Sequence, residues 1–247
     1  MRRAASDHRT RSHSCRTSRV KRGNALGSEV IPPQSWHRAT WSYAPYQAHQ
    51  TGSAPNSVVP GYDGNICIVL VGNGLDHGLR TSGGGRLTVR GIEFEDFSTA
   101  AIRLAAGSGH VVTGNGFGAS SGVSPWPLAN KSGVLIEGTA THAQVGSYAF
   151  GDRNVFAQST DAAVKLASNG VGSHIIQGNY IGFNFDGTKR NDSQNKYGIY
   201  VQDSGTNQIS YNFIGGSQLK ATVLTGASAG ANRIIENSIG IAPADDA

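Results

Sequence analysis

The sequence predicts an all-β fold, a single-stranded parallel β-helix, on three observations. From residue 64 onward, short apolar runs alternate with glycine, asparagine and serine, and helical periodicity is absent. A nine-residue phrase then recurs along the chain, and a second short apolar stretch follows each copy except the last. Strands that recur in this way are expected to pair with their own copies, in parallel and in register, which builds a solenoid.

The recurring phrase combines apolar positions with a glycine and an asparagine. It reads HIIQGNYIG at residues 174–182 and NQISYNFIG at 207–215, and further copies begin at residues 87, 110, 142 and 232. The copies at 87 and 142 are the weaker ones. The second apolar stretches cover residues 101–104, 133–136, 163–166, 198–201 and 222–225. Hairpins would need Asn-Gly turns at regular spacing, and these are scarce, so stacked coils are favoured.

The repeat register predicts which side chains fill the interior. One apolar column contains Phe94, Phe117, Ile181, Ile214 and Ile239, and a second contains Val89, Val112, Ile176, Ile209 and Ile234. The asparagines share one position, with Ser147 in the weak copy between them: Asn115, Asn179, Asn212 and Asn237. Stacked amides hydrogen-bond along such a column, so we interpret these asparagines as a structural ladder rather than a binding site.

The N-terminal part of the chain differs from the rest. Residues 1–50 hold 9 basic and 2 acidic side chains, whereas residues 51–247 hold 12 and 14. Residues 1–22 have almost no core-forming side chains, which is typical of a disordered arm, and residues 32–62 are interpreted as an irregular linker rich in proline and aromatic residues. A basic arm that binds nucleic acid or anionic surfaces is the alternative to a solvated tail. We therefore expect a disordered basic arm and linker over residues 1–60 and a β-helix domain over residues 61–247.

Composition excludes several classes of protein. No apolar run approaches the roughly 18 residues of a spanning helix, so no membrane span is expected. Two cysteines do not make a disulfide framework, and the 34 glycines lack the period of collagen. The near-neutral body gives no charge argument for nucleic-acid binding by the domain. No apolar segment follows the basic start, so no signal peptide is visible in the sequence.

Three phrases resemble those of a known family: TVRGIEF at 88–94, IIQGNYIG at 175–182 and NYIGFNFDG at 179–187. They look like bacterial right-handed parallel β-helix repeat proteins of the pectate-lyase-like superfamily, over about residues 64–247. The resemblance implies a right-handed solenoid, in agreement with the rule for parallel crossovers. It also implies an extracellular or cell-surface location. Because members include lyases, glycosidases, epimerases, tailspikes and repeat proteins without assigned activity, it implies the fold more specifically than the function.

Three middle units are longer than the others, and their extra residues suggest a binding surface. The insertions cover about residues 119–131, 148–160 and 183–196, after the first strand of each unit, and are expected to emerge on one face. Beside them the alignment places an outward aromatic column at Tyr148, Tyr180 and Phe213. Aromatic rings with charged groups at their edge are typical of polysaccharide sites, although stacked rings also simply shield coil edges. The expected substrate-binding residues are Trp126, Tyr148, Asp152, Arg153, Tyr180, Asp186, Lys189, Arg190, Asp192 and Phe213.

Two further columns have more than one interpretation. His110, His142 and His174 fall at one repeat position, where outward rings on adjacent coils would share a transition metal. No cysteine or carboxylate recurs beside them, so a polar ladder is favoured and no metal is expected. A column on the second strand contains two cations, which suits an acidic glycan or a solvated face: Arg103, Leu135, Lys165 and Tyr200.

A catalytic site is harder to identify. A lyase of the resembled superfamily needs carboxylates gathered on Ca²⁺ and an Arg or Lys as base, and a glycosidase needs paired carboxyls. Glu93 and Glu95 share a face but have no acidic neighbour in the next coil. The best cluster is Asp152, Asp186 and Asp192, although Asp186-Gly187 is also an ordinary turn pair. The catalytic residues stay unassigned, and Ca²⁺ is expected only for a lyase.

The sequence thus predicts an extracellular or surface module that binds a polysaccharide or cell-surface glycan without catalysis. A polysaccharide lyase or glycoside hydrolase and a purely structural stalk are the alternatives. The last strand, at residues 237–240, begins a coil that stops at Ala247. We therefore expect either a domain that is incomplete at its C-terminus or end-to-end self-association through the open coil.

Overall fold

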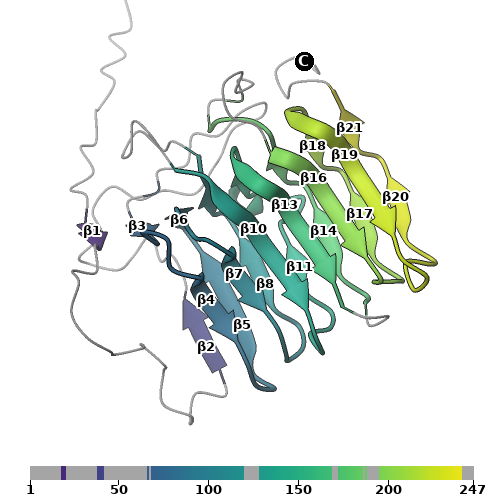
Figure 1. Ribbon diagram of the computed structural model, residues 1–247, viewed down its shortest axis with the longest axis horizontal. Coiled ribbons are helices and arrows are strands. Elements are labelled where there is room, and N and C mark those ends of the chain that lie inside the picture. The colour runs from purple at the N-terminus through teal and green to yellow at the C-terminus, as the bar shows by residue number, and fades with distance from the viewer. Residues whose placement is uncertain are drawn as a thin grey trace, which may run out of the picture.

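The computed structural model describes residues 66, 68–119, 128–168, 172–185, 187 and 195–240, together with the backbone of residues 18–20 and 38–41. These residues form a parallel β-helix, which confirms the predicted fold class (Figure 1). Each complete coil runs through three strands, one in each of three parallel sheets. Every strand pairs with its counterpart one coil away.

The three sheets are numbered in the order in which the chain passes through them in each coil. Sheet 1 contains β2 (Arg38–Trp41), β5 (Arg86–Arg90), β8 (Val111–Thr113), β11 (Gln144–Val145), β14 (Ile175–Gln177), β17 (Gln208–Ser210) and β20 (Arg233–Ile235). Sheet 2 contains β1 (Ser18–Val20), β3 (Ile68–Val71), β6 (Ile92–Glu95), β9 (Gly116–Phe117), β12 (Val155–Phe156), β15 (Tyr180–Ile181), β18 (Phe213–Ile214) and β21 (Ser238–Ile239). Sheet 3 contains β4 (His77–Thr81), β7 (Ala100–Leu104), β10 (Asn130–Glu137), β13 (Ser159–Ala167), β16 (Asn195–Gln202) and β19 (Ser217–Thr225).

Two short segments of the expected N-terminal arm belong to these sheets. β1 pairs in parallel with β3, and β2 pairs in parallel with β5. They therefore extend sheets 2 and 1 beyond the first coil of the repeat. The rest of residues 1–60 lies outside the described part of the chain.

The nine-residue phrase forms two strands rather than one. In the copy at 174–182, β14 ends at Gln177 and β15 begins at Tyr180, with Gly178 between them at a φ of 68°. Glycine adopts this left-handed conformation without the steric cost that a side chain would add. This bend forms the corner between sheet 1 and sheet 2, which is one of the corners of the three-sided coil.

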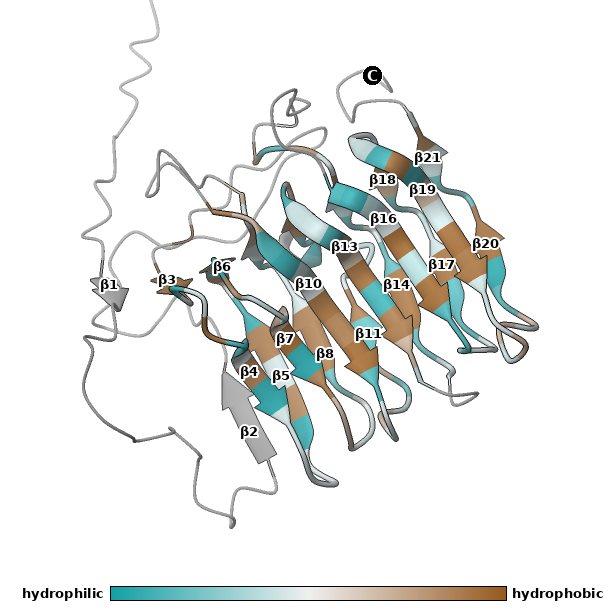
Figure 2. Cartoon of the chain, viewed as in Figure 1, coloured by the Kyte–Doolittle hydropathy of each residue, from teal (hydrophilic) through white to brown (hydrophobic). Residues whose placement is uncertain are grey.

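Both predicted interior columns are buried in the complete coils. In sheet 2 the rings of Phe94 and Phe117 are 5.3 Å apart and those of Phe117 and Phe156 are 4.5 Å apart, nearly parallel in both cases. The column continues through Ile181 and Ile214, and no member from Phe94 to Ile214 is more than 1% exposed. Figure 2 shows apolar residues of neighbouring strands lying next to one another across the sheets. The second column is equally buried: Val89, Val112, Val145, Ile176 and Ile209.

The asparagine ladder is confirmed and runs through five coils. Asn115 donates to Asn154, and Asn154 donates in turn to Asn179, over 3.2 and 2.9 Å. The series continues from Asn179 to Asn212 and from Asn212 to Asn237, each over 2.9 Å. Each amide also donates to a backbone carbonyl of the corner, so the ladder satisfies buried polar groups where the chain turns.

The ladder corrects the predicted register of the weak copy. Its member there is Asn154, not Ser147. β11 also lies one residue further along than the alignment places it, because Val145 pairs with Val112. The chain leaves the repeat after β11 and returns to register at Asn154, so residues 146–153 are an insertion between β11 and β12.

The three insertions therefore do not emerge on one face, which corrects the prediction. Residues 118–129 connect β9 to β10 and residues 182–194 connect β15 to β16, both at the corner between sheets 2 and 3. Residues 146–153 lie at the other end of sheet 2, at its corner with sheet 1. Much of the first and third insertions lies outside the described residues, so the middle insertion is the one whose side chains define a surface.

Candidate functional site

The insertion between β11 and β12 carries three of the predicted site residues, Tyr148, Asp152 and Arg153. It leaves sheet 1 at Gly146, makes a 3₁₀ turn over Phe150–Asp152 and rejoins the ladder at Asn154. Its neighbour on the surface is the corner between β17 and β18. We call the combined surface the aromatic corner, defined by Tyr148, Phe150, Arg153, Tyr211 and Phe213.

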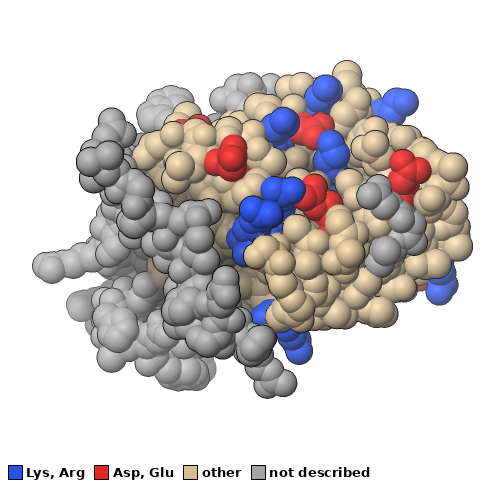
Figure 3. Space-filling view, turned by 60° about the horizontal axis from the view of Figure 1, so that its bottom comes forward, with Lys and Arg blue, Asp and Glu red and all other residues tan. Residues whose placement is uncertain are grey.

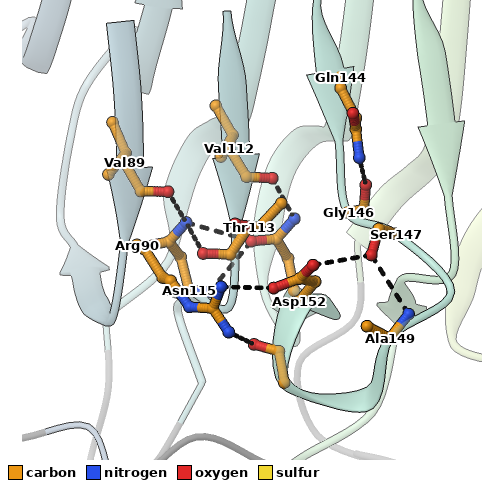
Figure 4. Close-up of polar contacts among 12 residues, drawn as sticks. Val89, Arg90, Val112, Thr113, Asn115, Gln144, Gly146, Ser147, Ala149 and Asp152 are labelled. Carbon is orange, nitrogen blue, oxygen red and sulfur yellow. Dashed lines mark hydrogen bonds and ion pairs between the residues drawn. The ribbon is translucent and has the colours of Figure 1, made fainter. Parts of the chain in front are cut away.

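A polar clamp fixes the insertion to the end of β5, two coils earlier (Figure 4). Arg90, at the end of β5, forms an ion pair with Asp152 over 2.6 Å and donates to the carbonyl of Gly151 over 3.0 Å. The other oxygen of Asp152 accepts from the Ser147 hydroxyl over 2.9 Å, and that hydroxyl accepts from the backbone of Ala149. Because one carboxylate holds both ends of the loop, the conformation of residues 147–152 is set before any ligand arrives.

The clamped loop presents aromatic rings to solvent. Tyr148 is 48% exposed and Phe150 is 41% exposed. The Tyr148 ring lies 4.1 Å from that of Tyr211, at an interplanar angle of 56°. Phe213, on β18, is partly exposed beside them. Rings in contact from two coils make a surface on which a flat apolar face can stack.

Tyr211 has a conformation that its residue type disfavours. Its φ is 55°, in the left-handed region, at the position directly before the ladder asparagine. Gly114 and Gly178 stand at this position in earlier coils, with φ of 63° and 68°, and Glu236 stands there in the next coil, with a φ of 53°. A side chain there costs about 1–2 kcal/mol relative to glycine. The left-handed conformation therefore belongs to this corner of the coil, and at Tyr211 it occurs beside the ring of Tyr148.

Arg153 lies beneath the exposed rings. Its Cζ is 5.0 Å from the centroid of the Tyr180 ring, 5.4 Å from that of Phe150 and 5.7 Å from that of Phe213. The residue is only 7% exposed. Burial lowers the pKa of its guanidinium, and the nearby Tyr180 acts in the opposite direction. The guanidinium therefore links the loop to β15 and β18 by cation–π contacts.

The predicted outward column of Tyr148, Tyr180 and Phe213 is wrong in two respects. Val155, not Tyr148, pairs with Tyr180 in register, because of the insertion. Tyr180 is also only 1% exposed, since it belongs to an apolar layer on the outer side of sheet 2 that includes Phe183 and Phe185. Truncating Tyr180 would therefore open a packed layer rather than test a surface contact.

Residues of the third insertion fold back to build that layer. Phe185 packs over β9, where a Cβ at Gly116 would lie 2.6 Å from its ring. Phe183 packs over Gly215 in the same way. These aromatics cover the sheet, so they are not displayed as ligand contacts.

The structure brings Tyr148, Asp152, Arg153, Tyr180 and Phe213 into one region, although Tyr180 is buried and Asp152 is paired with Arg90. The other five predicted site residues lie outside the described part of the chain: Trp126, Asp186, Lys189, Arg190 and Asp192. Sequence reasoning missed Tyr211 and Arg90. The signal for Tyr211 was a bulky residue where the earlier copies of the phrase have glycine, although the last copy has Glu236 there.

The histidine column is also corrected. Ala143, not His142, lies between His110 and His174, because its backbone donates to Nδ1 of His174 over 3.1 Å. Nδ1 of His110 likewise accepts from the backbone of Leu87 over 3.0 Å, and both rings are fully buried. Among the described residues, no group of three His, Cys, Asp or Glu side chains is arranged to hold a metal ion. These two histidines act as ladder residues at the corner between sheets 3 and 1.

The outward column of sheet 3 has the predicted register. Arg103 pairs with Leu135, Leu135 with Lys165 and Lys165 with Tyr200. Each of its two cations has an acidic partner, Glu137 for Arg103 and Asp161 for Lys165. On the face drawn in Figure 3, basic side chains lie beside acidic ones in the same way. The outer side of sheet 3 therefore gives little electrostatic preference for an acidic ligand.

Removing the clamp is expected to loosen the insertion without unfolding the domain. In Arg90→Gln the ion pair to Asp152 is lost, at a cost of about 1 kcal/mol because both side chains are partly exposed. We expect chymotrypsin to cleave after Tyr148 or Phe150 several times faster than in the parent protein. Arg86→Gln, at the exposed start of the same strand, is the control. Equal cleavage rates in the parent and Arg90→Gln would show that the clamp does not hold the loop.

No protein-family model, curated protein or solved structure matches the chain. What is established is therefore the fold itself, a solenoid of three parallel sheets. Within the described segments, no helix has the length and apolar character needed to cross a bilayer.

Proposed function

We propose that the chain is a glycan-binding β-helix module that holds a polysaccharide at the aromatic corner without cleaving it. The observation that carries the proposal is the ring pair formed by the exposed Tyr148 and the partly exposed Tyr211, which come from two different coils. Aromatic rings at a surface bind sugars through the apolar faces of pyranose rings. A fixed pair of rings loses little conformational entropy when such a chain docks.

The rigid support of this surface favours the proposal. Arg90 and Asp152 hold the loop, and the asparagine ladder holds the corner from which it emerges. Binding residues on a rigid scaffold are already in position, so they lose little conformational entropy when the ligand binds. We extend the proposal to membership of the pectate-lyase-like superfamily and to an extracellular or cell-surface location, which the repeat phrases and the three-sheet coil support.

Catalysis is not part of the proposal. A lyase or glycosidase needs a carboxylate that is available to a metal ion or to the scissile bond. Both oxygens of Asp152 are engaged, by Arg90 and by Ser147. A purely structural stalk is the other alternative, and it predicts that no glycan binds.

The test is a glycan array on the whole chain, followed by calorimetry on the glycans that it selects. Tyr211→Gly is expected to lower the association constant about tenfold, the loss of one stacking contact. Its thermal midpoint should stay the same or rise, because glycine relieves the left-handed conformation. Tyr148→Ala should lower binding by a similar factor.

Tyr200→Ala is the matched control, since Tyr200 is a partly exposed tyrosine on the outer side of sheet 3. It should leave binding unchanged. The proposal fails if no glycan on the array is bound, or if Tyr211→Gly and Tyr148→Ala keep the affinity of the parent protein.

A further inference from the structure

Stacking on sugars does not explain why the aromatic corner contains a buried arginine. Nε and Nη1 of Arg153 are enclosed by protein and have no hydrogen-bond partner among the described residues. Three rings surround the guanidinium, at 5.0 to 5.7 Å. Ring faces attract a cation, but they accept the N–H groups of a guanidinium only weakly. An arginine that is 93% buried normally has an oxygen acceptor in reach.

The described part of the chain supplies no counter-charge to Arg153. The adjacent carboxylate, Asp152, is turned toward Arg90, with 2.6 Å between the paired atoms. The hydroxyl of Tyr180, on a ring that the guanidinium covers, is also buried without a hydrogen-bond partner in the described segments. Two neighbouring donors without an acceptor, one of them charged, are costly to keep in an apolar layer. A bound oxyanion would satisfy both.

We propose that Arg153, with the Tyr180 hydroxyl, is the anion anchor of the aromatic corner, and that the glycan bound there carries carboxylate or sulfate ester groups. This inference rests on the proposed glycan-binding function and narrows its ligand class. A guanidinium recognises either group through paired N–H donors in one plane. The flanking rings then stack on the sugar that bears the acid group.

The geometry also assigns a role to Phe150. Its ring covers Arg153 at 5.4 Å, yet the residue is 41% exposed on the 3₁₀ turn. Because Nε and Nη1 are enclosed, the ring of Phe150 has to swing aside when an acid group docks. The Arg90 clamp holds the backbone of the turn through the neighbouring residues Gly151 and Asp152, so the movement is confined to this side chain.

The test compares acidic glycans with neutral counterparts of the same backbone. Alginate oligosaccharides, which carry only carboxylates, are measured beside their carboxyl-reduced forms, and carrageenan oligosaccharides, which carry only sulfate esters, beside their desulfated forms. By calorimetry, the parent protein should bind at least one acidic form about tenfold more tightly than its neutral counterpart. Arg153→Gln should bring that ratio below about twofold. Arg86→Gln, which removes an exposed arginine from sheet 1, should preserve it.

A second measurement needs no polysaccharide. At constant ionic strength, sodium glucuronate should raise the thermal midpoint of the parent protein, whereas glucose with sodium chloride should not. Arg153→Gln should melt at the same temperature as the parent or higher, because it removes a buried unpaired charge. Equal affinity for acidic and neutral forms, an unchanged ratio in Arg153→Gln, or no response to any of these probes would overturn the anion anchor. Equal affinity that still depends on Tyr211 would leave the proposed glycan-binding function standing.

Discussion

Ile181→Asp is expected to prevent the chain from folding. Ile181 is fully buried on β15, between Phe156 of the preceding coil and Ile214 of the next one. An aspartate at this position faces only apolar side chains, and no described cation lies in the column to pair with it. Burying an unpaired carboxylate costs several kcal/mol, which is comparable with the whole stability of a domain at about 5–15 kcal/mol.

The control for this variant is the same substitution on the preceding strand. Ile175 lies on β14 and is 39% exposed, so Ile175→Asp should leave the far-ultraviolet circular dichroism spectrum and the melting curve nearly unchanged. Ile181→Asp should be insoluble or lack a cooperative melt. A soluble β-rich Ile181→Asp with the melting temperature of the parent protein would contradict the inward column of sheet 2.

Acidification from pH 7 to pH 4 is expected to destabilise the domain through His174. Burial, with smaller contributions from His142 and His110, lowers the pKa of His174 from 6.5 to about 4. As the pH falls below 6.5, the unfolded chain takes up a proton at this residue and the folded chain does not, until about pH 4. Stability is therefore complete above pH 6.5 and falls by on the order of 3 kcal/mol by pH 4. Burial also lowers the pKa of His110, so it adds to the loss in the same direction.

The ladder supplies a matched variant for this prediction. Asn207 stands at the position of His174 in the next coil, and its Oδ1 accepts from the backbone of His174 over 3.0 Å. An asparagine at position 174 can accept from the backbone of Ala143 in the same way, so His174→Asn should fold. It should no longer show the loss of stability of about 3 kcal/mol between pH 6.5 and pH 4 that is attributed to His174. Urea unfolding between pH 4 and 7.5 measures how the free energy of unfolding changes with pH. The control is His142→Asn, because His142 is exposed. An unchanged slope in His174→Asn would place the acid sensitivity elsewhere.

The fold could be predicted because its two main determinants are local and repeated. Apolar residues at one position of the phrase, such as Ile181 and Ile214, have to lie against one another once coils stack in register. The asparagine position was equally visible, because a side-chain amide supplies an acceptor together with two donors, one for the next coil and one for the backbone. These requirements are the same in every coil, so one register explains them all.

The weak copy was misread because its spacing imitates the phrase. Ser147 follows a glycine and precedes an aromatic residue, as Asn179 does, whereas the true ladder residue, Asn154, lies seven positions later. A serine hydroxyl cannot replace the two amide donors that the ladder uses. Giving weight to that chemistry rather than to spacing would have located the insertion, and with it the surface on which Tyr148 lies.

The burial of Tyr180 could not be predicted from the repeat. It depends on Phe183 and Phe185, which lie in a connection without repeat character and fold over the outer side of sheet 2. The pairing of Arg90 with Asp152 is likewise a contact between residues 62 positions apart that no pattern announces. The site therefore depends on the non-repeated parts of the chain, and there the periodicity of the sequence does not predict burial or side-chain contacts.

The return of residues 146–153 to register has a consequence for how this scaffold can change. The chain leaves β11 and re-enters at Asn154 with Val155 opposite Gly116 and Phe156 opposite Phe117, as if nothing had been added. A single arginine, Arg90 from two coils earlier, holds the loop from outside. Loops of other lengths and sequences that keep an acidic residue for Arg90 should therefore graft at this corner without disturbing the stack. Ligand preference and structural integrity can then evolve, or be engineered, separately in this protein.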